Sequence, residues 1–192
     1  MANDTPDIPD EFKAWAKMGD IHGVPDSLSI ELLQELKLWI DAGQVQVEGG
    51  NQKYFDILET QYPIGLNRID WRGVREHLSF DVFPIRKEPM AGDETEQRLA
   101  SCLNMLLEWL KSSGIALQEQ VVWVGDVSNI SLHTTIETLL ELYPLLFSWP
   151  QHSYVLPLTG QWCLNYTMEG QLFFGRAENA IAHGCVNLDA AS

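Results

Sequence analysis

Two stretches of the chain carry apolar residues at the spacing of an amphipathic helix. In residues 27–42 leucines recur every four positions, and Gly43 is placed to end the helix in a left-handed conformation. In residues 93–112 a second leucine stripe is followed by Gly114. We therefore predict helices over both ranges, each with one apolar face turned towards a core.

Alternating patterns in the first half of the chain favour strands. Residues 44–48 alternate with period two, and the turn at 49–51 leads to apolar positions at 54–58, which predicts a β-hairpin. Residues 67–83 have two interpretations. Asp70 could cap a short helix, whereas the end of that segment alternates like a strand.

The second half of the chain is richer in strand patterns. We predict strands at 115–117, 120–124, 153–156, 162–166 and 171–174. Ser131 is placed to cap a third helix that continues to Tyr143, where Pro144 ends it or kinks its last turn. The short turn at 167–170 makes the last two strands a hairpin.

These elements together predict a mixed α+β fold. Connections between the last strands are too short for parallel crossovers, so we expect an antiparallel C-terminal sheet with helices packed on one face. We predict a single domain over 1–192, with any subdivision in the Pro- and Gly-bearing loop at 84–92. The polar ends, 1–11 and 178–192, are predicted to be flexible.

Composition narrows the class of protein. The chain has 45% apolar and 20% charged residues, as globular proteins do, and 27 Asp and Glu against 12 Lys and Arg give a formal charge of -15. Such a balance disfavours nucleic acid and anionic membranes as partners. Apolar runs fall short of the ~18 residues needed to span a membrane. Without a secretory signal pattern, and with three widely spaced cysteines, the expected location is the cytoplasm.

One short motif suggests metal chemistry. Gly19-Asp20-Ile21-His22-Gly23 resembles the GDxHG turn of calcineurin-like metallophosphoesterases, in which Asp and His bind one metal of a two-metal site. The preceding residues 13–17 have a helical pattern instead of the apolar strand that such a turn should end, and the Gly-Asn-His turn of that family is absent. We therefore interpret the motif as a capped loop and predict no metal and no cofactor.

Cys163 is a candidate nucleophile. With His133 or His152 as base and Asp126 as orienting group it would form a thiol triad. Its position between apolar residues of a predicted strand favours a buried, inert thiol. A hydrolase that uses Asp20 and His22 with a metal, or Cys163 as nucleophile, is the alternative function.

The C-terminal stretches Trp149-Pro150-Gln151-His152-Ser153-Tyr154-Val155-Leu156-Pro157, Trp162-Cys163-Leu164-Asn165-Tyr166 and Leu172-Phe173-Phe174-Gly175 resemble the terminal sheet of small bacterial immunity proteins. These are encoded beside polymorphic toxins, including those of contact-dependent growth inhibition. The resemblance implies an acidic, cofactor-free cytoplasmic protein that binds one cognate toxin domain, with a nuclease as a candidate.

The charge pattern suggests how such a partner would be bound. After Lys111 the chain has one basic residue, Arg176, and many carboxylates, which suit a basic protein surface. Trp and Tyr are common at the centres of interfaces. The predicted partner-binding residues are Asp126, Glu137, Glu141, Glu169, Trp71 and Trp149.

Overall fold

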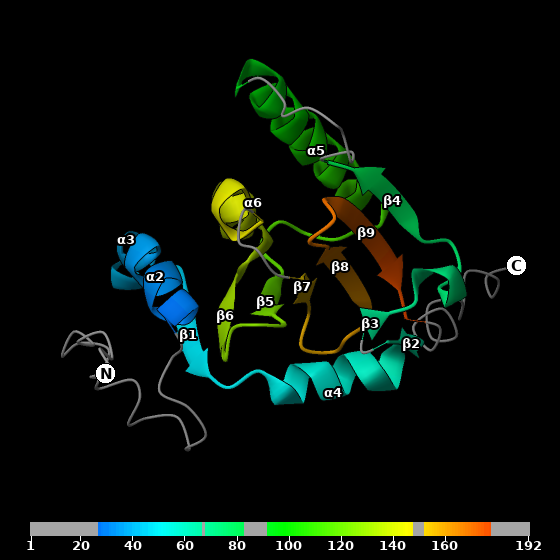
Figure 1. Ribbon diagram of the computed structural model, residues 1–192, viewed down its shortest axis with the longest axis horizontal. Coiled ribbons are helices and arrows are strands. Elements are labelled where there is room, and N and C mark those ends of the chain that lie inside the picture. The colour runs from blue at the N-terminus through cyan, green and yellow to red at the C-terminus, as the bar shows by residue number, and fades with distance from the viewer. Residues whose placement is uncertain (1–26, 67, 83–91, 148–151, 178–192) are drawn as a thin grey trace, which may run out of the picture.

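A computed structural model describes residues 27–66, 68–82, 92–147 and 152–177. Its elements are α2 (Ser27–Glu35), α3 (Lys37–Asp41), β1 (Gln46–Gly49), α4 (Gln52–Gln61), β2 (Ile64–Gly65), β3 (Arg68–Ile69), the 3₁₀ turn η1 (Trp71–Gly73), β4 (Leu78–Asp81), α5 (Gly92–Ser112), β5 (Gln120–Gly125), β6 (Ile130–Thr135), α6 (Ile136–Leu146), β7 (Ser153–Leu156), β8 (Trp162–Tyr166) and β9 (Gln171–Arg176). The mixed α+β class predicted from the sequence is confirmed (Figure 1).

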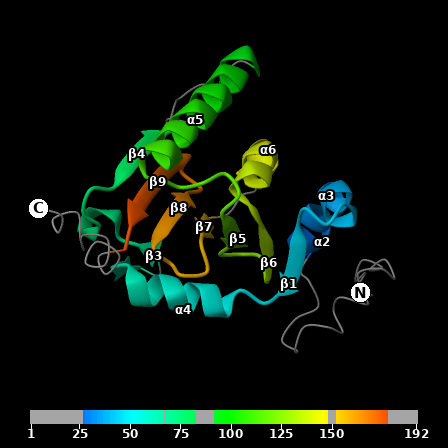
Figure 2. The same ribbon diagram turned by 180° about the vertical axis from the view of Figure 1, so that it is seen from behind.

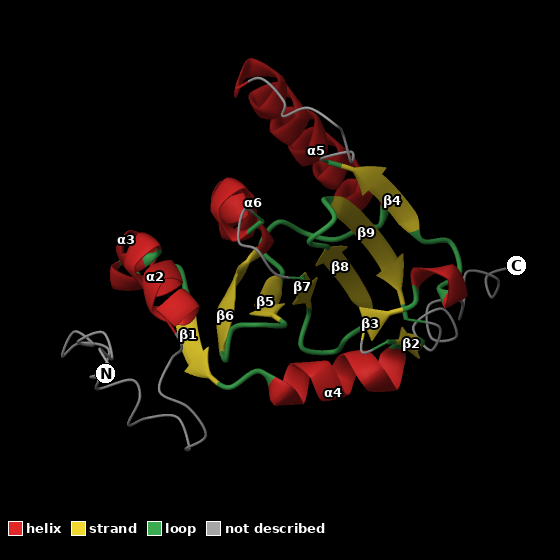
Figure 3. Ribbon diagram, viewed as in Figure 1, coloured by secondary structure: helices red, strands yellow, loops and turns green. Residues whose placement is uncertain are grey.

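A seven-stranded antiparallel sheet forms the centre of the fold. Its strand order is β1-β6-β5-β7-β8-β9-β4, and β2 and β3 form a separate two-stranded ladder. The strands from β7 to β9 follow one another along the chain and lie side by side (Figure 3). The predicted C-terminal antiparallel sheet and its hairpin are therefore confirmed.

Both faces of the sheet are buried because apolar residues occupy successive positions in its central strands. Trp123 faces α2, α5 and α6, whereas Val122 and Val124 face α4. Figures 1 and 2 show α4 on the opposite side of the sheet from α5 and α6. The expectation that the helices pack on one face is thus wrong, since Tyr54 and Leu58 of α4 bury themselves on the other face.

The hairpin predicted at 44–58 is wrong in its second half. Strand β1 pairs with β6, and residues 52–61 form α4. Tyr54 and Leu58 lie four residues apart and share a helix face that covers the sheet. Asn51, just before the helix, donates from Nδ2 to the carbonyl oxygen of Gly125 at 3.0 Å and so holds the start of α4 to the end of β5.

The third helix starts later than Ser131 predicts. Residues 130–135 form β6, and Thr135 caps α6 by accepting a hydrogen bond from the backbone N–H of Thr138 at 3.3 Å. Residues 115–117 form no strand, while Pro144 lies inside the last turns of α6.

The helices at 27–42 and 93–112 agree with prediction, apart from a break at Leu36. In the segment 67–83 the strand pattern at the end is confirmed by β4. The predicted capping role of Asp70 is also found, because its side chain accepts from the backbone N–H of Arg72 at 3.3 Å and caps the 3₁₀ turn η1, although no longer helix follows it in the described residues 74–82. The predicted flexible ends, 1–11 and 178–192, and most of the predicted loop at 84–92 lie outside the described residues. In the described part of the chain no helix has the length and apolarity required to cross a membrane.

Candidate functional site

A cavity with both polar and aromatic walls lies on the α4 side of the sheet and has a volume of about 270 Å³. It is open to solvent and lies where β3 and η1 come against β7, β8 and β9. Figure 1 shows β3 close to β8 and β9. Its walls are formed by Arg68, Ile69, Asp70, Trp71, Arg72, His77, His152, Asn165, Thr167 and Phe173.

His152 is the most unusual residue of this cavity. Its side chain is 1% exposed, and both ring nitrogens are buried without a hydrogen-bond partner among the described residues. Its backbone is fixed, because its N–H donates to Asp126 Oδ1 at 3.0 Å and its carbonyl accepts from the N–H of Asp126. Burial, together with the nearby cation of Arg68, lowers the pKa of His152, while Asp126 and Glu169 act in the opposite direction.

The aromatic wall is held by a buried amide. Asn165 accepts a hydrogen bond from Trp71 Nε1 at 3.0 Å and donates to the carbonyl oxygen of Ser153 at 3.0 Å. The Trp71 and Phe173 rings stack with centroids 5.4 Å apart and an interplanar angle of 6°. A polar residue in an apolar strand thus positions the indole, so the wall is preorganised.

Two ion pairs lie at the rim. Arg72 binds Asp70, with Nε 2.9 Å from Oδ1, and this hydrogen bond lowers the pKa of Asp70. Arg68 Nη1 lies 3.6 Å from Glu169 Oε1, with both side chains about half exposed. Glu169 itself has a lowered pKa, owing first to a backbone hydrogen bond and to a smaller extent to His152 and Arg68.

Comparison with known proteins gives no family for this arrangement. No protein-family model, curated protein or solved structure matches the chain. The chemistry of the cavity is therefore inferred from its own residues.

Three of the predicted partner-binding residues gather around the cavity. Trp71 forms part of its wall, Glu169 pairs with Arg68, and Asp126 holds the backbone of His152. Asp126 and Glu169 are both exposed. Glu137 and Glu141 belong to α6, which packs on the other face of the sheet, and Trp149 lies outside the described residues.

The sequence-based predictions did not include Arg68, Asn165 and Phe173 as site residues. Asn165 has a detectable signal, since it is a polar residue at an inward position of an otherwise apolar strand. No local sequence pattern identifies Arg68 as a site residue, because β3 is two residues long and its position depends on the tertiary fold.

Among the described residues, Cys163 and His152 of the alternative hydrolase do not come together. Cys163 is fully buried, and burial raises the pKa of its thiol well above neutrality. In the β7–β8 ladder Ser153 pairs with Tyr166 and Val155 with Leu164, so His152 and Cys163 lie at opposite ends. Asp20 and His22 lie outside the described residues.

The described residues contain no candidate metal site. Among them, no three or more His, Cys, Asp or Glu side chains lie close enough together to bind one metal ion.

A second polar cluster joins β1, α4 and β6 at the sheet edge. Glu48 Oε2 lies 2.8 Å from His133 Nε2 and accepts from the hydroxyl of Tyr54 at 2.9 Å, while Lys53 Nζ lies 2.6 Å from Oε1. Partial burial alone would raise the pKa of Glu48, but these hydrogen bonds lower it to about 2. The cluster ties three elements together, and its polar groups satisfy one another.

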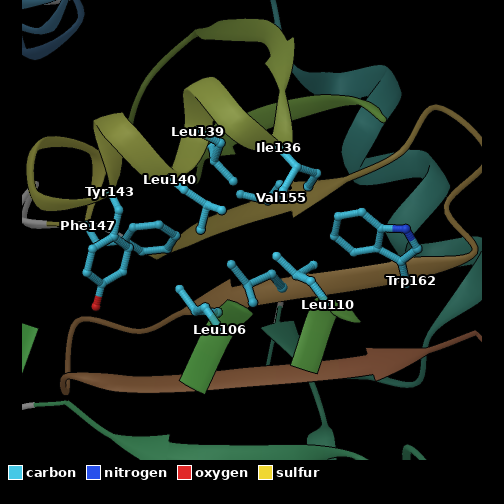
Figure 4. A pocket seen from close by; sticks show the side chains of 10 residues that line it. Leu106, Leu110, Ile136, Leu139, Leu140, Tyr143, Phe147, Val155 and Trp162 are labelled. Carbon is cyan, nitrogen blue, oxygen red and sulfur yellow. The ribbon is translucent and has the colours of Figure 1, made fainter. Parts of the chain in front are cut away.

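A further space lies between α5, α6 and the sheet (Figure 4). Apolar and aromatic side chains such as Leu106, Leu139 and Trp162 point into it from three elements. Its volume of about 10 Å³ is that of a packing gap in the core, since a single water needs about as much. It offers no room for a ligand.

Proposed function

We propose that this protein is an immunity-type inhibitor that binds a basic bacterial toxin domain, such as a nuclease, in the cytoplasm. The observation that carries the proposal is the position of Asp126 and Glu169, two exposed carboxylates that contact residues lining a cavity with an aromatic wall. Interfaces commonly combine an aromatic anchor with surrounding charges.

The charge of the molecule supports a basic partner. The formal charge of -15 would speed encounter with a cationic surface, and lysine and arginine side chains that hold phosphate in a nuclease would meet carboxylates instead. The resemblance of the C-terminal strands to immunity proteins favours the same partner class.

The test uses two double variants with the same change in net charge. Asp126→Asn with Glu169→Gln alters the cavity face, and Glu137→Gln with Glu141→Gln alters exposed positions of α6 on the other face. The amide introduced by Asp126→Asn retains an oxygen that can accept the backbone hydrogen bond of His152. Long-range electrostatics change equally in both variants, so a difference between them reports the contact surface.

The measurement is growth of bacteria that express each variant together with a candidate basic toxin domain taken from a gene adjacent to that of this protein, followed by calorimetric titration of the purified pair. We expect the wild type and the α6 variant to restore growth, and the cavity-face variant to weaken binding by ~30-fold or more, as loss of a hot spot does. Equal binding by both double variants, or no protection by the wild type, would contradict the proposal.

A further inference from the structure

The buried imidazole of His152 is unexplained by the packing around it. Buried polar atoms in folded proteins have hydrogen-bond partners in the large majority of cases, and an unpaired one destabilises the fold. Here both ring nitrogens lack a partner among the described residues, although the residue lines a cavity with room for further atoms. The imidazole is therefore a candidate hydrogen-bonding group for a molecule bound beside it.

The two arginines at the cavity, Arg68 and Arg72, differ in how closely they are paired with a carboxylate. Arg72 is held by two contacts to Asp70, at 2.9 and 3.2 Å. Arg68 lies 3.6 Å from Glu169, which is beyond hydrogen-bond distance, and the pair is half exposed. Such an exposed ion pair contributes little to stability. The Arg68 guanidinium can therefore bind a second carboxylate at small energetic cost, and Glu169 marks where that carboxylate would lie.

The remaining walls suit a flat, apolar body. Ile69, Phe173 and His77 line the cavity, and Phe173 and His77 are partly exposed while Trp71 is buried behind them. Aromatic rings pack well against such walls, in stacked or edge-on geometry. The volume of about 270 Å³ lies below the range of roughly 300–1,000 Å³ for drug-sized ligands, which favours a small ligand with one ring or two fused rings.

We propose that this cavity binds a small aromatic carboxylate. The carboxylate displaces Glu169 from Arg68, the ring packs against Phe173 and His77, and His152 lies beside the site as a candidate hydrogen-bonding group. This site does not depend on the inhibitor role proposed above, because a small molecule can occupy it in the absence of any protein partner.

The test measures binding of benzoate and indole-3-carboxylate to the 192-residue chain by NMR titration, with the indole N–H of Trp71 as reporter. Benzamide, which has the shape of benzoate without its charge, is the matched probe. We expect at least one carboxylate to bind, and benzamide to bind at least ~10-fold more weakly because it loses the charge-assisted hydrogen bond to Arg68.

Three variants separate the site from a general charge effect. Glu169→Gln should raise the affinity for the carboxylate, because its internal competitor is removed, whereas Arg68→Gln should lower that affinity by ~10-fold. Glu137→Gln changes the net charge as Glu169→Gln does, but on α6, and should leave binding unchanged. The proposal is overturned if neither carboxylate binds, if benzamide binds equally well, or if both glutamate variants change affinity equally.

Discussion

His152 places a titratable ring beneath the cavity, with the charges of Arg68, Asp126 and Glu169 around it. Because its pKa is lowered in the fold, the unfolded chain binds more protons below the usual value of 6.5. The contribution of His152 to the free energy of unfolding is therefore lost as the pH falls from 6.5 towards the pKa of His152 in the folded state. No such loss occurs above that window.

Replacing the ring tests this linkage. We expect His152→Leu to reduce the loss of stability between about pH 7.5 and pH 5.5, measured by urea denaturation, because the titrating group is gone. At the higher pH the variant should be at least as stable as the wild type, since an unpaired buried polar ring is replaced by an apolar side chain of similar size. Equal acid sensitivity of the two proteins would count against a buried, neutral His152.

The packing of η1 against β9 depends on the absence of a side chain at one position. A Cβ atom built on Gly175 would lie 2.8 Å from Trp71 Cζ3 and 2.9 Å from Val74 Cγ1. Both of these atoms belong to buried side chains, so they have little room to move. The indole of Trp71 reaches Asn165 and Phe173 because β9 lets it approach this closely.

Gly175→Ala should accordingly lower the free energy of unfolding by about 1–3 kcal/mol, the usual effect of overpacking a core. Gly65→Ala is the matched control, since its Cβ would meet Asp70 at an ordinary 3.4 Å, and it should change stability by less than about 0.5 kcal/mol. Chemical denaturation of both variants checks this. Equal effects would mean that the contact between η1 and β9 is not tight.

At the level of elements, local patterns were enough to predict several helices and strands. The helix at 92–112 and strands β7, β8 and β9 follow from periodicity and turn residues. The helix start predicted at Ser131 was wrong, because a serine before apolar residues is compatible both with a helix N-cap and with a strand. Pairing of residues 130–135 with β5 on one side and β1 on the other decides for the strand, and the cap passes to Thr135.

Helix α4 and the cavity could not be predicted from local sequence patterns, because both depend on tertiary contacts. Residues 54–58 alternate too briefly to separate helix from strand, and the face of the sheet that α4 covers is not visible in sequence. Carboxylates Asp126 and Glu169 were predicted to bind a partner, but their gathering with Arg68 and His152 requires strand register that links β5, β7 and β8. Local patterns therefore supplied the residue types, and the fold determined their proximity.

The molecule as a whole has two apolar cores that share one sheet. Leu106 of α5 is buried on one face and Leu58 of α4 on the other, and neighbouring residues of β5 face alternate cores. Loss of packing on either face should weaken strands that both faces use. We therefore expect the described segments to unfold as one cooperative unit.

Leu58→Ala and Leu106→Ala test this coupling, each with an expected loss of about 2–5 kcal/mol from a cavity in a packed core. Hydrogen–deuterium exchange followed by mass spectrometry should show faster exchange in α6 for the Leu58 variant and in α4 for the Leu106 variant, because global opening exposes both helices. Faster exchange confined to the helix on the mutated side would instead mean that each core opens by itself. In that case the cavity on the α4 face could change its occupancy without disturbing the larger core.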